Sequence, residues 1–396
     1  MKLTYINAAI VIGILAFALP SAAQEGTETG RRPKYLVVNL PDTLGGTGSA
    51  ANSINNRGWV MGAANLPGNT TEHATVWIYG KPIDLGTLGG PSSSVAWSSV
   101  KNDSGMIAGI SDTSIVDPLG EVWSCAEAFF PSSSGHTCQG FVWQDRKMSA
   151  LPTLGGNNGV AAGDNTMGQI AGWAETTTHD PTCIAPQVLQ FEAVVYEPAK
   201  GLITPLPPLP GDPDGAATAI NDLGQVVGIS GICANAVGGA SAAHAVLWEN
   251  GAPTNIGNLG GVAWNTPTAI NNHGVVVGFS DLPGDSADSP NYHAFLWTKS
   301  GGITDLGTLP GDSLSVAWGI NAQGQVVGQS INSSGSSRAF LWQNGTMTDL
   351  NTLVAHGELS LVYANDINDS SEIVGGAYNS KTGNAPAFLA VPLRTQ

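Results

Sequence analysis

The chain has 396 residues and a formal net charge of −16, and charged residues make up only 11% of the sequence. A chain with this negative charge and so few lysines and arginines excludes nucleic acid and anionic membranes as partners. Both are bound through basic side chains, which displace counterions from the phosphate groups. The 52 glycines, beside 42% hydrophobic residues, indicate a β protein rich in turns and not a disordered chain.

The N-terminus carries the features of a signal peptide. Lys2 is followed by an apolar run over residues 8–19, which is too short to cross a bilayer, and then by Ser21-Ala22-Ala23. Small residues there suit signal peptidase, so we predict a signal peptide over residues 1–23 and a linker over 24–34. No later stretch of the sequence is apolar for long enough to form a membrane helix. We therefore expect a secreted protein, extracellular or periplasmic, with no membrane partner.

A repeat unit fills the chain from residue 35 to residue 396. Its clearest copy contains 306–311 (LGTLPG), 320–328 (INAQGQVVG) and 338–342 (RAFLW). The unit recurs seven times, with a turn glycine that is replaced by Ser371 in the last copy. Intervals of about 50 residues suit four short strands and their turns, as in one blade of a β-propeller.

Each unit predicts four strands, which we name a to d. Ile-Asn-x-x-Gly before Val-Val-Gly predicts a hairpin between strands a and b, because Asn tolerates the turn and Gly supplies the positive φ. Strand c, clearest at residues 293–297, is apolar on both alternating faces and so needs cover on both sides. Strand d, at 303–306, leads through a Gly-rich turn to the next unit.

The two ends of the chain decide the architecture. Strand d first occurs at residues 35–40, before the first complete unit, and the chain stops after the seventh strand c, at 387–389. The count closes only if the N-terminal strand completes the last blade, which removes the exposed sheet edges. We therefore predict an all-β fold, a seven-bladed β-propeller of four-stranded blades closed by the N-terminal strand. The alternative is a solenoid, which would need polar caps and no such offset.

These elements resemble the HAF-repeat family of bacterial extracellular proteins. The family's His-Ala-Phe occurs literally at His293-Ala294-Phe295, and the resemblance extends over roughly residues 35–392. It implies secretion and a propeller-like fold, and it implies no particular activity.

Motifs for catalysis and metal binding are lacking in the sequence. It contains no metalloprotease, phosphate-loop or serine-hydrolase motif. Asp212-Pro213-Asp214-Gly215 begins like a calcium loop but lacks the later acidic ligands. His136 and His179 lie near Cys138 and Cys183, a pattern that could form a zinc cluster, although an oxidising compartment disfavours it. We expect no metal and no cofactor.

Three long insertions between strands b and c interrupt consecutive blades, at roughly 112–138, 174–190 and 231–243. They contain all four cysteines, Cys125, Cys138, Cys183 and Cys233. The first two would close one loop and the last two would join adjacent blades, but other pairings and free thiols stay open. With strand a innermost, the b-to-c and d-to-a loops open on one face, which we call the top face. Loops joined by disulfides on this face would suit a binding surface. The alternative is that the insertions accumulated without a function and that the disulfides only protect them from proteases.

We place the candidate ligand site on this top face. Extra tryptophans, beyond those repeated in strand c, lie at or just before strand a, near the channel mouth. Exposed indoles could stack on sugar rings while aspartates accept hydrogen bonds from hydroxyls; the alternative is that these indoles only fill the channel or a blade interface. The candidate residues are Trp97, Trp123, Trp264, Trp318, Tyr363, Asp212, Asp281 and Asp312.

The functional hypothesis is a monomeric extracellular binding or scaffold module with a polysaccharide or a cell-surface protein as its partner. The alternative is a carbohydrate-active enzyme, a hydrolase or lyase, with carboxylates at the channel mouth. Carboxylates about 5–9 Å apart suffice for glycoside hydrolysis, but spacing in the sequence does not reveal such a pair. Binding is favoured over catalysis, and enzymatic activity stays open.

Overall fold

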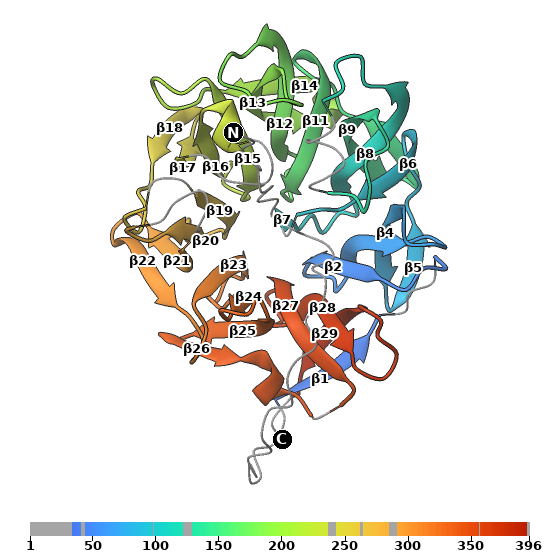
Figure 1. Cartoon of the computed structure of the whole chain (residues 1–396), viewed down its shortest axis with the longest axis vertical. Coiled ribbons are helices and arrows are strands. Elements are labelled where there is room, and N and C mark those ends of the chain that lie inside the picture. The colour runs from blue at the N-terminus through green and yellow to red at the C-terminus, as the bar shows by residue number, and fades with distance from the viewer. Residues whose placement is uncertain are drawn as a thin grey trace, which may run out of the picture.

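The protein is a seven-bladed β-propeller, as predicted (Figure 1). The computed structural model describes residues 34–40, 44–97, 99–121, 129–236, 243–261, 264–284, 291–355 and 357–393. The predicted signal peptide and most of the linker lie outside these residues, as do Trp123 and Cys125. Within the described residues, no helix is long and apolar enough to cross a membrane.

The blades follow one another in chain order, and strand a is the inner strand of each repeat unit. The strands of blades 1 to 3 are β2 (Ser49–Ile54), β3 (Val60–Asn65), β4 (Glu72–Ile78) and β5 (Lys81–Asp84); β6 (Gly89–Ser94), β8 (Ile107–Val116), β9 (His136–Gln144) and β10 (Lys147–Ala150); and β11 (Gly155–Asp164), β12 (Ile170–His179), β13 (Leu189–Glu197) and β14 (Leu202–Leu206). Those of blades 4 to 6 are β15 (Asp214–Ile220), β16 (Val226–Gly231), β17 (His244–Glu249) and β18 (Ala252–Asn255); β19 (Asn265–Ile270), β20 (Val276–Asp281), β21 (Tyr292–Thr298) and β22 (Gly302–Gly307); and β23 (Leu314–Ile320), β24 (Val326–Ile331), β25 (Ser337–Gln343) and β26 (Thr346–Asp349). Blade 7 contains β27 (Leu359–Ile367), β28 (Ile373–Asn379) and β29 (Ala387–Pro392), and the short helices are η2 (Pro198–Lys200), α1 (Cys233–Ala236) and η4 (Leu350–Leu353).

The N-terminal strand closes the ring. β1 (Tyr35–Asn39) is the outer strand of blade 7 and pairs antiparallel with β29, with Val38 opposite Leu389. In Figure 1 the blue β1 lies beside the red C-terminal strands. The offset between the two chain ends therefore predicted the closure correctly.

The repeated strand-c tryptophans belong to the core, as expected. Trp77 and Trp248 are 0% and 1% exposed. Trp248 packs between blades 3 and 4, with Ala193 and Leu206 on one side and Val226 on its own blade. Large aromatic side chains at this repeated position therefore stabilise the interfaces between blades.

A glycine is required where strand b passes the inner strand. The register of strand a slips by one residue there, for example between Pro267 and Ala269 of β19. A Cβ on Gly278, in the opposite strand, would lie 2.0 Å from the carbonyl oxygen of Thr266. The close approach of these backbones excludes any side chain, which explains the glycine of Val-Val-Gly.

The asparagine of Ile-Asn-x-x-Gly links each blade to the next, a role that the sequence did not reveal. Its side-chain Nδ2 donates to the backbone carbonyl oxygen of the equivalent asparagine one blade further on, and blade 7 returns to blade 1. The seven bonds, 2.6 to 3.1 Å long, run Asn55, Asn102, Asn165, Asn221, Asn271, Asn321, Asn368 and back to Asn55. We call this set the asparagine ring.

Blade 3 has five strands, against the predicted four. The extra strand, β7 (Ser99–Val100), comes from the inner segment of blade 2 and pairs parallel with β11 near the centre of the molecule (Figure 1). The hydroxyl of Ser99 donates to the carbonyl of Thr268, in blade 5, over 3.0 Å. Lys101 forms a 2.6 Å ion pair with the buried Asp366 of blade 7. This segment therefore ties four blades together at the channel.

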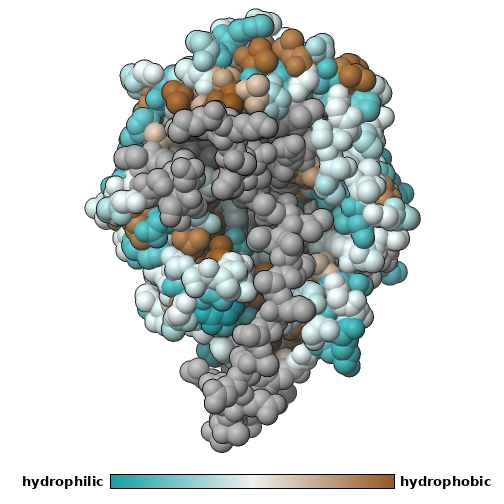
Figure 2. Space-filling view, in the orientation of Figure 1, coloured by the Kyte–Doolittle hydropathy of each residue, from teal (hydrophilic) through white to brown (hydrophobic). Residues whose placement is uncertain are grey.

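Figure 2 shows the described surface on one side of the molecule as largely hydrophilic or neutral, with hydrophobic residues in separate small groups.

Candidate functional site

Four serines position the d-to-a loops of the top face. Each lies two residues after the glycine of strand b, and its hydroxyl accepts the backbone N–H of a loop leucine. The bonds, 2.8 to 3.0 Å long, join Ser111 to Leu88, Ser230 to Leu209, Ser280 to Leu259 and Ser330 to Leu309. The entry to strand a is therefore fixed in these blades.

The structure brings three of the candidate tryptophans together. Trp264 and Trp318 belong to one cluster with Phe279, and Trp97 packs against it. Trp264 stacks on Tyr292 at 6.1 Å, and Trp318 meets the edge of Phe279 at 6.3 Å. Trp264 and Trp318 are each 8% exposed, so most of both rings contacts protein.

Trp97 connects this cluster to a second one over blades 2 to 4. Its ring lies 6.3 Å from Trp173 and 6.2 Å from Phe129. Trp97 is only half-buried, and its Nε1 has no hydrogen-bond partner among the described residues. Among the three described candidate tryptophans, Trp97 therefore has the most exposed ring, while its Nε1 atom is buried.

The three tryptophans differ in position along strand a. Trp318 stands three residues before its turn asparagine, Trp97 five and Trp264 seven. Blade 2 also has β7 between Trp97 and its turn asparagine, and β7 pairs with β11. Sequence alignment alone could not separate Trp97 from Trp318, because this departure from the repeat appears only in the backbone.

Tyr363 lies apart, on the side of blades 7 and 1. Its ring covers Gly376, where a Cβ would come within 2.2 Å of Cζ. Burial, with the nearby Glu72 carboxylate adding to it, raises the pKa of Tyr363 to about 12. Burial likewise raises the pKa of Glu72 to about 8, and a hydrogen bond with Ser94 opposes this shift. Sequence spacing gave no sign of this Glu72–Tyr363 pair.

The three candidate aspartates already have protein partners. Asp212 accepts from the Ser230 hydroxyl at 2.6 Å and pairs with His244 at 2.8 Å. Asp281 accepts the backbone N–H of Trp264 at 2.8 Å, and Asp312 pairs with Arg338 at 2.9 Å. Their visible role is to hold the loops around the tryptophans.

A polar cluster that the sequence did not predict lies between the first two insertions. Asn158 donates to Asp117 at 2.8 Å and to Glu175 at 3.2 Å, while Glu121 accepts the N–H of Leu189 at 2.6 Å. Burial, followed by repulsion from Glu121, raises the pKa of Glu175 to about 7. These groups are almost fully buried, so they order the two insertions against each other.

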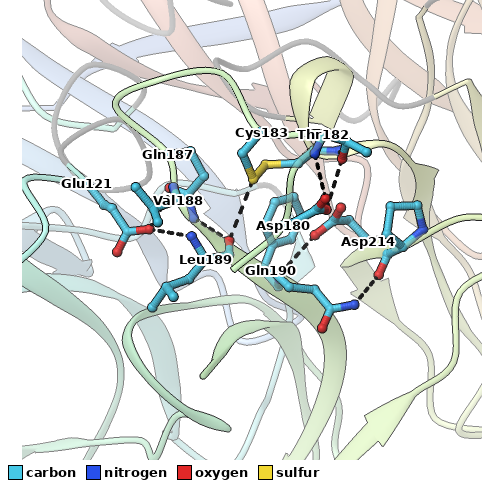
Figure 3. Close-up of a disulfide and its surroundings, with 12 residues drawn as sticks. Glu121, Asp180, Thr182, Cys183, Gln187, Val188, Leu189, Gln190 and Asp214 are labelled. Atoms are coloured by element: carbon cyan, nitrogen blue, oxygen red, sulfur yellow. Dashed lines mark hydrogen bonds between the residues drawn. A yellow bond between two sulfur atoms is a disulfide. The ribbon is translucent and has the colours of Figure 1, made fainter. Parts of the chain in front are cut away.

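A disulfide joins the second and third insertions (Figure 3). Cys183 and Cys233 are bonded, so the predicted staple between blades 3 and 4 is confirmed. Cys138 is also disulfide-bonded, and Cys125 lies outside the described residues. Two of the three insertions are thus covalently linked.

Two aspartates share a proton beside this disulfide. Burial raises the pKa of Asp214 to about 8, and its hydrogen bond with Asp180 adds to the shift. Burial also disfavours ionisation of Asp180, but hydrogen bonds from Asp214 and Thr182 outweigh it and lower that pKa. Asp214 therefore donates to ionised Asp180, which orders the base of the stapled loops.

Metal-type donors meet at the same place. Asp180, Cys183 and Cys233 place donor atoms within 4.8 Å of one another, the one such set among the described residues. Thiolates, not disulfide sulfurs, bind metals. With both sulfurs in a disulfide, the arrangement serves the loop structure.

The comparisons with known proteins support the fold and leave the function open. Residues 213–387 match a family model described as a protein of unknown function (DUF3466). The curated proteins contain no match to this chain.

Among solved structures, an oligogalacturonate lyase from Vibrio parahaemolyticus aligns with a TM-score of 0.50 at 8% identity, covering 90% of this chain and 97% of the lyase. A dipeptidyl peptidase 4 from Porphyromonas gingivalis aligns with a TM-score of 0.39 at 12% identity, over 84% of this chain and 51% of the peptidase. A sialidase from Trypanosoma rangeli aligns with a TM-score of 0.39 at 10% identity, over 91% of this chain and 57% of the sialidase. At such identities the likeness concerns the propeller fold alone.

Proposed function

We propose that this protein is an extracellular binding module whose top face engages a polysaccharide. The observation that supports this most is Trp97, whose half-buried indole lies between two aromatic clusters. A sugar ring would supply an apolar C–H face for the exposed part of this aromatic ring.

The surroundings of Trp97 support binding by a rigid surface. The loops are ordered by the Cys183–Cys233 disulfide and by hydrogen-bonded carboxyl groups. Little ordering entropy would then be lost when a polymer binds.

The cysteines support the proposed location. Cys183 and Cys233 are bonded to each other, and Cys138 is also in a disulfide. Disulfides persist mainly in oxidising compartments, which agrees with a secreted protein in the periplasm or outside the cell.

Affinity electrophoresis through gels that contain single polysaccharides tests this proposal. We expect retardation in one polymer. Trp97→Phe should weaken binding by about twofold to tenfold, because the smaller ring keeps only part of the stacking surface, and Trp97→Ala should weaken it further. Trp342→Phe, which changes a partly buried indole of strand c in a different hydrophobic cluster, is the matched control. Free migration in every gel, or equal effects of Trp97→Phe and Trp342→Phe, would refute the proposal and favour a protein partner.

A carbohydrate-active hydrolase or lyase is the second candidate. Glu72 favours it, because this half-buried carboxyl group, with its pKa raised to about 8, stays protonated at neutral pH beside Tyr363. A proton donor of this kind suits cleavage of a glycosidic bond. Clearing of the polymer around the band, abolished by Glu72→Gln, would establish catalysis in place of simple binding.

A further inference from the structure

A pocket opens on the other side of the molecule, at the seam where β1 closes the ring. Its volume is about 470 Å³, within the range of about 300–1,000 Å³ that small-molecule sites occupy. It lies between blade 7 and the bottom turns of blade 1 and includes Leu40, Gly58 and Gly80 in its lining. We call it the seam pocket. It is separate from the top-face loops, so it does not depend on the function proposed above.

The two walls of the seam pocket differ in polarity. Val38, Leu40 and Leu389 supply an apolar wall from the closing strands. Val38 remains 41% exposed, so that wall is open to solvent. Arg57 and Glu372 face it from the bottom turns of blades 1 and 7.

Neighbouring groups hold the polar wall in place. The Arg57 guanidinium lies 4.7 Å above the Trp59 ring and donates to the carbonyl of Asp103 at 2.9 Å. Glu372 accepts from the Asn368 side chain at 2.7 Å. The guanidinium is thus directed toward blade 2, and the Glu372 carboxylate remains as a charged acceptor on this wall.

Tyr79 stands at the rim in a costly conformation. It is 89% exposed, and its φ of 51° lies in the left-handed region. The same turn position has Asn250 in blade 4 and Asn344 in blade 6, with φ of 53° and 50°. Asparagine tolerates this conformation, whereas a bulky side chain is strained there. Strain of this kind concentrates where a side chain serves a ligand.

From this geometry we infer that the seam pocket binds a neutral sugar residue. The Tyr79 ring and the apolar wall suit the C–H face of a pyranose, and the Glu372 carboxylate suits its hydroxyl groups, from which it would accept hydrogen bonds. The negative charge of Glu372 disfavours a uronate or another anionic ligand.

Saturation-transfer difference NMR with cellobiose, maltose and xylobiose tests this inference on the full chain. We expect transfer to at least one sugar, and Tyr79→Asn should weaken its binding by about fivefold to tenfold through loss of the aromatic contact. The thermal stability of Tyr79→Asn should equal or exceed that of the parent protein, because asparagine relieves the strained turn. Asp145→Asn, at the corresponding turn position of blade 2 with φ of 53°, should change nothing.

Other outcomes would overturn the inference. These are an absence of transfer to all three sugars, or unchanged affinity in Tyr79→Asn. A signal that is lost in Trp97→Phe but kept in Tyr79→Asn would belong to the top face. It would refute the seam pocket and leave the proposed function standing.

Discussion

Each asparagine of the ring satisfies the backbone of its own turn and that of the next blade. In blade 4, Asn221 Oδ1 accepts the N–H groups of Leu223 and Gln225, both at 3.0 Å. Its Nδ2 donates to the Asn271 carbonyl in blade 5. One buried amide therefore defines the hairpin and the spacing between two blades.

Asn221→Ala should lower the free energy of unfolding by about 2–4 kcal/mol, because it leaves buried donors and an acceptor unpaired. Urea unfolding followed by tryptophan fluorescence measures the change. Leu223→Ala, in the same turn and 69% exposed, should change it by less than about 0.5 kcal/mol. Equal losses for the two variants would contradict the ring's role.

Residue-level roles were only partly predictable. The turn was predicted correctly, since Gly324 has φ of 73° and Ser371 keeps φ of 60° where it replaces glycine. The bond to the next blade was not predicted, because its acceptor lies about 50 residues away, at a distance set by blade packing. Pairs such as Glu72 with Tyr363 escaped prediction for the same reason.

Among the elements, β7 departs most from the repeat. Blade 2 has Lys101 directly before the turn asparagine, where blade 6 has Ile320. The Lys101 ammonium reaches Asp366, whose side chain is 0% exposed and also accepts the backbone N–H of Ile54. The positive charge of Lys101 at the centre of the propeller is thus balanced by the carboxylate of Asp366, two blades away.

Lys101→Met should therefore cost about 2–3 kcal/mol, somewhat below the loss for a fully buried pair, because Lys101 is partly exposed. The double variant Lys101→Met with Asp366→Asn should recover part of that loss, since asparagine keeps an acceptor for Ile54 without a charge. A double-mutant cycle in urea measures the coupling. Additive effects would show that the pair contributes no coupling.

The insertions show what element-level patterns can and cannot predict. Their position on one face followed from the strand order, and the Cys183–Cys233 staple followed from their adjacency in consecutive blades. The cluster around Glu175 did not, because its members come from two loops whose paths the repeat does not determine.

At the scale of the whole molecule, buried carboxyl groups control the response to pH. Burial raises the pKa of Asp164 to about 8, of Asp214 to about 8 and of Glu175 to about 7. The folded protein thus retains protons that the unfolded chain has lost above about pH 4. Stability should therefore fall as the pH rises from about 5 to 8, by about 1.4 kcal/mol per pH unit for each such group.

Differential scanning calorimetry at pH 5, 6.5 and 8 checks this expectation through Tm. Asp164→Asn, which removes the titrating group and keeps an acceptor for the N–H groups of Lys101 and Asn102, should flatten the slope. A Tm that rises with pH over this interval would contradict the assignment.

The global architecture was the most predictable property. The sequence contains seven copies of one unit, and the strand that the last copy lacks occurs at the N-terminus. This pattern predicts a closed ring, and β1 pairs with β29 accordingly. The functional faces were less predictable, because the residues that distinguish them, such as Trp97 and Tyr79, break the repeat.

The asparagine ring has a direction but no first member. Every donor points to the following blade, and Asn368 points back to Asn55 across the junction of the chain ends just as Asn221 points to Asn271 within the chain. The bonds among the bottom turns are therefore the same at every blade junction. A circularly permuted gene that starts at another blade would encode the same cycle of bonds.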